Sequence, residues 1–435
     1  MAGKEDTSGN PMRYVWFITL YNARAYYPIL AILFLDLGLT LDQYVLLNLV
    51  WAASIFLFEV PSGALADTLG RKTLLVSASV LMIAELSCLL FAPKDGGWLL
   101  VSVCVVNRLL SGISEAAASG ADEALAYDSL PEGNRDDAWD DLLSTAMRYR
   151  SVGFVIAMVI GGLMYDPSIV NRVLPESIQI SETLAHRLPV ALVLAQGIAC
   201  LFITLRMVEP KKTHEEGMMK ACRDAVSLTL ATAKWVFTNP STRVIVIIGL
   251  SIDAVVRNFA TITSSYYRLI ELPEWTYGFI GAAIGVGGYV VPSIASRLNR
   301  RFGTLANLAL AALFSLVGLS GLIPADSWWC LLPATLLMMT LGFLGFTMSR
   351  ALNRASDSGK RATVLSVKGL AFNLGYGSFS LAFSMLLAAF PDDPSGNQLR
   401  HALLWQVPFF AIVTGGLLLA GKRRMSRHLV VNEET

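Results

Sequence analysis

Long apolar runs separated by short polar segments recur from one end of the chain to the other. Twelve of these runs reach about 20 residues, the length that a helix needs to cross the ~30 Å hydrocarbon core of a bilayer. We therefore predict twelve transmembrane helices. Their expected ranges are 13–37, 42–66, 73–93, 98–127, 142–165, 189–208, 242–270, 275–298, 304–324, 327–353, 362–390 and 401–421.

Composition agrees with a location in the lipid bilayer. Of the 435 residues, 54% are hydrophobic and only 15% are charged, whereas a soluble chain carries roughly a quarter charged residues. The first apolar run is too long for a signal peptide, has Arg24 near its middle and lacks a small-residue cleavage site. We expect an all-α integral membrane protein, and the net charge of +1 gives no indication of a nucleic-acid partner.

Basic residues are distributed unevenly between the loops on the two sides of the predicted membrane. One side has only Lys94, Arg172, Arg187 and Arg400. The other side holds Arg71, Lys72, Arg135, Lys211, Lys212, Arg297, Arg300, Arg301, Arg354, Lys360, Arg361, Lys422, Arg423 and Arg424. By the positive-inside rule this basic side is cytoplasmic. Because the number of helices is even, both termini are expected there.

The sequence also contains an internal repeat. Val60-Pro61-Ser62 recurs 231 residues later as Val291-Pro292-Ser293, and each copy is followed by a basic loop. The same offset superimposes the first predicted helix on the seventh. We therefore predict two pseudo-symmetric six-helix bundles, at 1–208 and 242–435. The intervening segment, 209–241, is expected to be a cytoplasmic linker with an amphipathic helix on the membrane surface.

One short loop lies between the second and third predicted helices. It reads Gly63-Ala-Leu-Ala-Asp67-Thr-Leu-Gly70-Arg71-Lys72 and resembles the corresponding loop of major facilitator superfamily transporters, although Thr68 replaces a basic residue. The resemblance implies two six-helix halves with substrate bound between them near the midplane. It also implies that the glycines allow close helix approach and that the charged residues form a cytoplasmic gate. Asp128 is the expected partner of Arg71 in that gate.

Two arginines lie within predicted spans, where unpaired charge is costly. Arg24 is in the first span and Arg257 is in the seventh, near the repeat offset. The two arginines could both bind the same carboxylate or phosphate group of a substrate. Alternatively, each is neutralised by a neighbour, and Asp253 lies one helical turn from Arg257.

The fourth predicted span carries three charges spaced by seven residues. Arg108, Glu115 and Asp122 would share one face of a continuous helix and could hold or pass a proton. Arg108 with Gly112 resembles the fourth-helix motif of proton-coupled members, although Ser111 replaces a glutamine. The small residues from Gly112 to Ala121 would equally suit close helix packing.

Further polar groups lie in other predicted spans. Glu59 is a fourth candidate for proton coupling, and its expected partner is Arg148; Glu85 has no evident partner in the sequence. Lys368 is a possible cavity cation, and Tyr21 or Tyr27 is expected to face a cavity. The predicted substrate-binding residues are Asn22, Arg24, Tyr27, Asp253, Arg257 and Lys368.

The fifth predicted span contains a series of small residues. Gly153, Ala157, Met158, Gly161 and Gly162 resemble the fifth-helix signature of drug:proton antiporters, but Ala157 and Met158 replace its Gly-Pro pair. Glu59-Val-Pro-Ser-Gly63 and Arg361-Ala-Thr-Val-Leu-Ser366 are similar to bacterial efflux-type members. This resemblance implies a location in the bacterial inner membrane.

The chain lacks the sequence motifs of nucleotide-driven or hydrolytic proteins. It has no Walker lysine loop, no H-E-x-x-H and no G-x-S-x-G, and its cysteines and histidines lack metal-ligand spacing. We expect no cofactor and no enzymatic activity. The favoured function is proton-coupled export of a small organic solute by a monomer. The alternative is uptake or exchange of an organic anion bound by Arg24 and Arg257.

Overall fold

The computed structural model describes residues 7–209, 218–356, 361–390 and 397–433. Within these ranges every regular element is helical, and twelve helical segments are long and apolar enough to cross a membrane. The predicted all-α fold with twelve spans is therefore confirmed. The helices of the first half are α1 Asn10–Asn22, η1 Tyr27–Ile29, α2 Leu30–Asp36, α3 Leu41–Leu69, α4 Arg71–Leu90, α5 Gly97–Ala118, α6 Ala121–Asp128, η2 Glu132–Asn134, α7 Arg135–Tyr165, α8 Pro167–Val173, η3 Glu176–Ile178 and α9 Glu182–Leu205.

The remaining helices follow the predicted spans closely. They are α10 Met218–Thr238, α11 Pro240–Leu269, α12 Trp275–Arg301, α13 Thr304–Leu322, η4 Trp328–Cys330, α14 Leu331–Ala355, α15 Arg361–Ala388 and α16 Asn397–Glu433. Helix α10 corresponds to the amphipathic helix expected in the linker. Its exposed apolar side chains include Met219, Leu228 and Leu230.

The first span is broken rather than continuous. Helix α1 ends at Asn22, and residues 23–26 are not helical before η1 and α2 complete the span. Pro28 explains the break, because proline lacks an amide hydrogen and its ring collides with the carbonyl group four residues earlier, which belongs to Arg24. Proline also disfavours helical geometry in the residue before it.

The fourth span is broken as well. Gly120 adopts a left-handed conformation with φ of +75°, and it separates α5 from α6. A residue with a side chain rarely adopts this φ, whereas glycine does so readily. The continuous helix predicted for 98–127 is therefore wrong at its end.

The described residues divide into two compact units. The first unit contains residues up to Leu39, Val50–Ser227 and Pro273–Gly285; the second contains Thr40–Leu49, Leu228–Leu272 and the chain from Val286 onward. Helices α3 and α12 are thus each shared between the units. Both helices contain the proline of the repeated Val-Pro-Ser sequence, Pro61 in α3 and Pro292 in α12.

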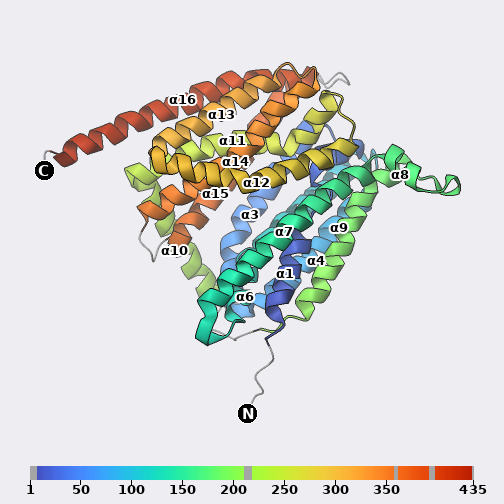
Figure 1. Cartoon of the computed structure of the whole chain (residues 1–435), viewed down its shortest axis with the longest axis horizontal. Helices are drawn as coiled ribbons and strands as arrows, with labels where there is room; N and C mark the ends of the chain where they lie inside the picture. The colour runs from blue at the N-terminus through green and yellow to red at the C-terminus, as the bar shows by residue number, and fades with distance from the viewer. Residues whose placement is uncertain (1–6, 210–217, 357–360, 391–396, 434–435) are drawn as a thin grey trace, which may run out of the picture. The chain divides into compact units, whose positions relative to one another are not determined.

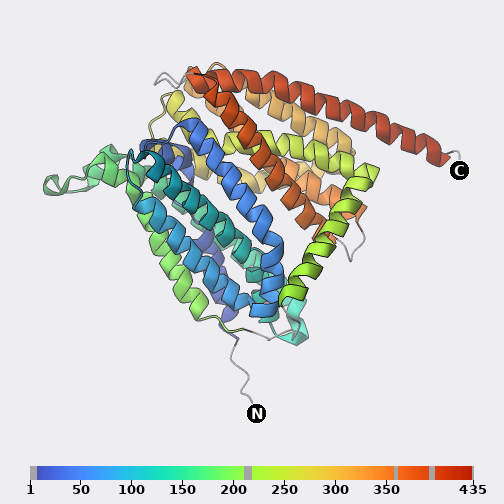
Figure 2. The same ribbon diagram turned by 180° about the vertical axis from the view of Figure 1, so that it is seen from behind.

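Each unit has a central helix or helix pair. In the first unit α4 packs against α5 and α9, and α1 packs against α7 and α9 (Figures 1 and 2). In the second unit α11 packs against α13, α14, α15 and α16 (Figure 1). The long buried face of α11 includes Ile252, Val256, Phe259 and Ile262, so this helix forms the core of its unit.

Candidate functional site

A buried ion pair lies in the first unit. Nη1 of Arg24 contacts Oε1 of Glu85, and the two side chains are only 2% and 1% exposed. The same Nη1 donates a hydrogen bond to the hydroxyl of Tyr26 at 2.7 Å. The guanidinium carbon lies 5.2 Å from the ring centroid of Tyr21. Arg24 is thus neutralised by a neighbour, and Glu85 is the partner that the sequence did not reveal.

The hydrogen bonding of this ion pair is incomplete. Among the described residues, Nη2 of Arg24 and Oε2 of Glu85 are buried without a hydrogen-bond partner. Nδ2 of Asn107 donates to the main-chain oxygen of Glu85 at 2.8 Å and so fixes the backbone, not the carboxylate. Buried charges of this kind are costly unless paired and fully hydrogen-bonded. The pair therefore has spare capacity to bind a further polar group.

A short hydrogen-bond chain links α1, α5 and α4 beside the ion pair. Ser114 donates to the main-chain oxygen of Ala78 at 2.9 Å, so Tyr21 donates to Ser114 at 2.7 Å. Tyr21 is buried, and the adjacent Glu115 is exposed. Glu115 interacts electrostatically with both Arg24 and Glu85. An accessible carboxylate therefore lies within the electrostatic range of a buried ion pair.

The three charges predicted to align on the fourth span do not do so. Arg108 and Glu115 share α5, but Asp122 belongs to α6, beyond the break at Gly120. The expected single face through all three residues is therefore wrong. Arg108 is buried, and its guanidinium carbon lies 4.5 Å from the ring centroid of Phe34.

Small residues of α5 nevertheless pack closely, as the alternative interpretation predicted. A Cβ atom at Gly112 would lie 2.8 Å from the main-chain oxygen of Trp51. Helices α5 and α3 therefore approach each other at this glycine more closely than a larger residue would allow.

The expected ion pair between Glu59 and Arg148 is also absent from the described residues. Arg148 is exposed and donates instead to Ser144 at 3.0 Å, one turn away on α7. Oε2 of Glu59 is buried and has no hydrogen-bond partner in the described part of the chain. Within the described ranges Glu59 thus remains a carboxylate without an ion-pair partner.

A second charge cluster lies in the second unit. Nη2 of Arg257 is 2.7 Å from Oδ2 of Asp253, one turn earlier on α11, so this predicted pair is confirmed. Nη1 of Arg257 donates to Oδ1 of Asn373 on α15 at 2.9 Å. Lys368, also on α15, interacts electrostatically with both Asp253 and Arg257. The cluster combines two cations with one carboxylate and has a net positive charge.

The two remaining substrate candidates are Asn22 and Tyr27. Nδ2 of Asn22 donates to the main-chain oxygen of Ile18 at 2.7 Å, which occupies part of its hydrogen-bonding capacity. Tyr27 is 41% exposed, whereas Tyr21 is buried. Of the two tyrosines expected to face a cavity, Tyr27 is therefore the accessible one.

The glycine-rich loop brings together part of the predicted gate. Nη1 of Arg71 lies 2.5 Å from Oδ2 of Asp128, and it also donates to the main-chain oxygen of Ala124 at 2.7 Å. The expected ion pair of Arg71 with Asp128 is therefore present. The side chain of Asp67 lies outside the described part of the structure.

The two glycines of this loop have different roles. Gly70 has a φ of +96°, a conformation that favours glycine. Gly63 is exposed, and no described atom outside its own helix lies within 4 Å of the position of a Cβ atom there. That Gly63 allows close helix approach stays a prediction.

Glu209 is a structural residue that sequence reasoning missed. Its carboxylate accepts hydrogen bonds from the backbone N–H groups of Lys72 at 2.8 Å and Arg71 at 3.2 Å. These groups begin α4, where backbone N–H groups lack intrahelical partners and favour a negative charge. A carboxylate more than 130 residues away in sequence therefore caps the helix that follows the glycine-rich loop. Only its position beside a basic loop hinted at this contact.

The glycines of the fifth span allow α7 to touch two backbones in the first unit. A Cβ atom at Gly161 would overlap the main-chain oxygen of Ala25, next to Arg24. A Cβ atom at Gly162 would lie 2.7 Å from the backbone nitrogen of Gly278 at the start of α12. The glycine positions thus support the broken segment that carries Arg24.

The described residues contain no group of three or more His, Cys, Asp or Glu side chains arranged to hold a metal ion. Twelve apolar helices that pair the charged side chains within them define the class of polytopic α-helical membrane proteins.

The chain belongs to the Major Facilitator Superfamily, whose family model matches residues 15–380. It is similar to the quinolone resistance protein NorA of Staphylococcus aureus strain MRSA252, with 25% identity over 328 residues and 74% of each chain covered. The NorA protein of strain MSSA476 is 24% identical over 326 residues, again with 74% of each chain covered. The family is one of transporters.

Solved structures show the same fold at low sequence identity. A mutant form of the nucleoside transporter NupG is similar with a TM-score of 0.72 and 11% identity, covering 94% of this chain and 98% of that one. A bacterial homologue of the human lysosomal transporter Spinster, in an inward-facing and unoccupied conformation, gives a TM-score of 0.68 and 14% identity, covering 97% and 98%. A D-xylose–proton symporter gives a TM-score of 0.63 and 14% identity, covering 93% and 95%.

Proposed function

We propose that this protein is a secondary active transporter that exports a small organic solute by alternating access and is driven by protons. The relatives named for quinolone resistance support export of an organic compound. The observation on which proton coupling depends is the cluster of Arg24, Glu85 and Glu115. This cluster has two carboxylates and one guanidinium, so adding one proton removes its net charge.

The proton would act by changing the electrostatic cost of excluding water. A net charge inside the membrane is costly, whereas a neutral cluster is tolerated in a dry environment. Protonation of Glu115, which is exposed, would therefore favour the state in which the cluster is closed off from water. Arg108, Glu59 and Asp122 are proposed as further groups that tune or relay this charge.

The proposed substrate-binding residues come from each unit considered by itself. Asn22, Arg24 and Tyr27 would contribute from the first unit, and Asp253, Arg257 and Lys368 from the second. Because each arginine is already paired with a carboxylate, a neutral or weakly charged organic solute suits these residues better than a strong anion.

Organic-anion uptake or exchange is the second candidate. The net positive cluster of Asp253, Arg257 and Lys368 favours it, because an anion there would balance the excess charge. Arg24→Gln and Arg257→Gln variants distinguish the two proposals. An anion clamp requires both variants to lose affinity for an anionic solute, and unchanged affinity in both would exclude it.

The glycine-rich loop is proposed to be a cytoplasmic gate formed by Gly63, Asp67, Gly70, Arg71, Lys72 and Asp128. The ion pair of Arg71 with Asp128 and the capping of α4 by Glu209 stabilise one arrangement of this loop. Asp67→Asn is expected to impair transport while the protein still inserts into the membrane. Transport at the wild-type rate by a correctly inserted Asp67→Asn protein would contradict the gating role.

The direct test is solute flux in proteoliposomes with an imposed pH gradient. A panel of small organic compounds that includes a quinolone should reveal a solute whose transport depends on the gradient and stops when a protonophore collapses it. Glu115→Gln should abolish that dependence, and the matched control Glu176→Gln should not, because Glu176 is exposed in η3, outside the spans. Flux independent of the gradient would contradict proton coupling.

The proposed setting is a bacterial inner membrane, with both termini in the cytoplasm and the protein acting as a monomer. The basic loops support this orientation. The proposed partners are the solute, protons and the lipid bilayer.

A further inference from the structure

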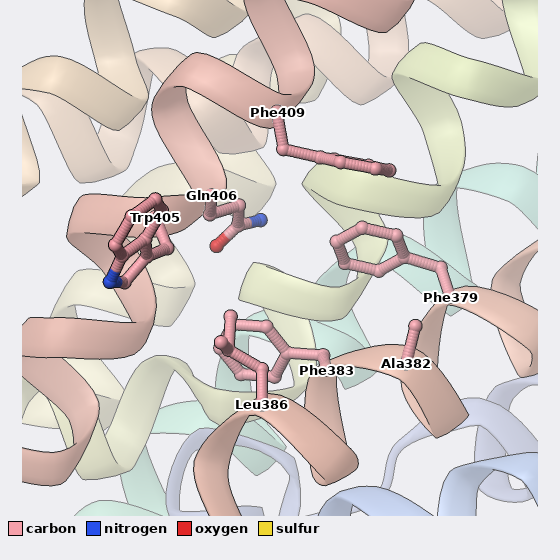
Figure 3. A pocket seen from close by; sticks show the side chains of 7 residues that line it. All are labelled: Phe379, Ala382, Phe383, Leu386, Trp405, Gln406 and Phe409. Atoms are coloured by element: carbon pink, nitrogen blue, oxygen red, sulfur yellow. The ribbon is translucent and has the colours of Figure 1, made fainter. Parts of the chain in front are cut away.

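A cavity of about 250 Å³ lies between α15 and α16 in the second unit. Helix α15 contributes Phe379, Ala382, Phe383 and Leu386, which follow helical spacing on one face, and α16 contributes Trp405, Gln406 and Phe409 (Figure 3). The small side chain of Ala382 leaves room between the aromatic rings. The indole nitrogen of Trp405 points away from the space between the rings. The interior of the cavity is thus apolar except for one amide.

That amide belongs to Gln406, which is 2% exposed. Within the part of the chain that the structure describes, neither its Nε2 nor its Oε1 has a hydrogen-bond partner. Figure 3 shows the amide pointing into the space bounded by Phe379, Phe383 and Phe409. A buried amide without partners is unfavourable, so a partner for it is expected inside the cavity.

The shape and lining of the cavity restrict that partner. A bound water needs two to four polar groups around it, and among the lining residues Gln406 alone directs a polar group inward. The rings of Phe379 and Phe409 are 6.2 Å apart at an angle of 39°, and those of Phe379 and Phe383 are 6.2 Å apart at 20°. Such rings favour an aromatic ligand by offset or tilted stacking.

We propose that this cavity binds a flat aromatic compound of one or two rings that carries one hydroxyl or amine group. The rings of the ligand occupy the space left by the small side chain of Ala382. Its hydroxyl or amine group forms hydrogen bonds with the amide of Gln406. Trp405 and Phe409 at the rim are 59% and 51% exposed, so the ligand can enter from an apolar phase. The site is independent of the proposed transport reaction.

Photoaffinity labelling of the full chain in lipid nanodiscs tests the proposal. The probe is a phenol carrying a trifluoromethyl diazirine, and the labelled peptides are identified by mass spectrometry. Saturable labelling is expected in peptides that contain residues 379–386 and 405–409. Unlabelled 2-naphthol should compete roughly five- to tenfold better than naphthalene, since only naphthol can hydrogen-bond to the amide.

Two variants locate the interaction. Ala382→Phe fills the cavity and should reduce labelling at least about tenfold, because the added ring occupies the space of the ligand. Its matched control is Ala388→Phe, at an exposed position of α15 outside the lining, which should label like the wild type. Gln406→Leu should make naphthol and naphthalene equal competitors.

Three results would overturn the proposal. Labelling that never saturates and spreads over all spans would indicate simple partition into lipid. An equal effect of naphthol and naphthalene on the wild-type protein would show that the amide takes no part. Undiminished labelling of Ala382→Phe would place the probe elsewhere and leave the cavity to water or an acyl chain. The competition between naphthol and naphthalene uses the wild-type protein, so it tests the proposal even if a substitution prevents folding.

Discussion

At the scale of single residues, the burial of Arg24 against Glu85 is the most consequential contact. The two side chains are 2% and 1% exposed, so neither charge is screened by water. Removing one partner leaves the other as an unpaired buried charge, which is worse than removing both. Two independent charges would not show this difference between losing one residue and losing both, so the difference identifies a coupled ion pair.

We therefore predict opposite outcomes for single and double substitutions of this pair. Arg24→Gln or Glu85→Gln alone should lower the free energy of unfolding by about 3–5 kcal/mol, whereas the double variant should recover most of the loss. Thermal unfolding of the purified proteins in detergent measures both effects. Arg148→Gln is the control, because Arg148 is exposed and its hydrogen bond within the described chain is to Ser144, one turn away on the same helix. Equal stability of both single variants and the wild type would contradict the coupling.

The capping of α4 by Glu209 gives a second prediction at this scale. Glu209→Ala removes the acceptor for two N–H groups and should destabilise the start of α4 by about 0.5–2 kcal/mol. Hydrogen exchange at Arg71 and Lys72 should then accelerate. Glu176→Ala, at an exposed position of η3, should leave that exchange unchanged. Protection of both amides that survives in Glu209→Ala would mean that the cap is dispensable.

At the scale of helices, the spans were predictable and their interruptions were not. Apolar runs determine where a helix crosses a membrane, because every polar backbone group there must be satisfied internally. Pro28 and Gly120 were visible in the sequence, yet both lie inside apolar runs that read as continuous spans. Whether these residues interrupt a span depends on neighbouring helices that supply hydrogen-bond partners for the freed backbone groups. A single sequence does not show those neighbours.

The same limit applies to the candidate site. Asp253 with Arg257 was predictable because the two residues are one turn apart on one helix. Glu85 and Asn373 were not identified as partners because they come from other helices of the bundle. Local spacing therefore revealed contacts within a helix, and only packing revealed contacts between helices.

The contact of α7 with the broken segment of α1 yields a prediction about packing. Gly161→Ala would place a Cβ atom onto the main-chain oxygen of Ala25, so α7 must move away. Such overpacking should destabilise the protein by about 1–3 kcal/mol. Gly288→Ala in α12 is the matched control, since no described atom outside that helix lies within 4 Å of its Cβ position. That change should be neutral or stabilise by up to about 1 kcal/mol.

Thermal unfolding of the two glycine variants checks this argument, and solute flux shows whether the Arg24 segment must be held in place for transport. A Gly161→Ala protein as stable as Gly288→Ala would show that α7 tolerates a side chain at this contact. The expectation that these glycines permit close packing would then fail.

At the scale of the whole molecule, one helix of each half has its first residues assigned to the other unit. The start of α3, within Thr40–Leu49, belongs to the second unit, and Tyr44 donates there to the main-chain oxygen of Thr261 at 2.8 Å. The start of α12, within Pro273–Gly285, belongs to the first unit. Because Pro61 and Pro292 occupy matching places in these two helices, the exchange follows the sequence repeat.

The repeat and the even number of spans lead to a prediction about topology. Loops with many basic residues stay in the cytoplasm, so both ends of the chain should be cytoplasmic. Green fluorescent protein fused to either end should fluoresce, and alkaline phosphatase at either end should be inactive. Alkaline phosphatase inserted between α8 and α9 should be active, which provides the control. Fluorescence at one end combined with phosphatase activity at the other would require an odd number of crossings, and the two-bundle arrangement would then be untenable.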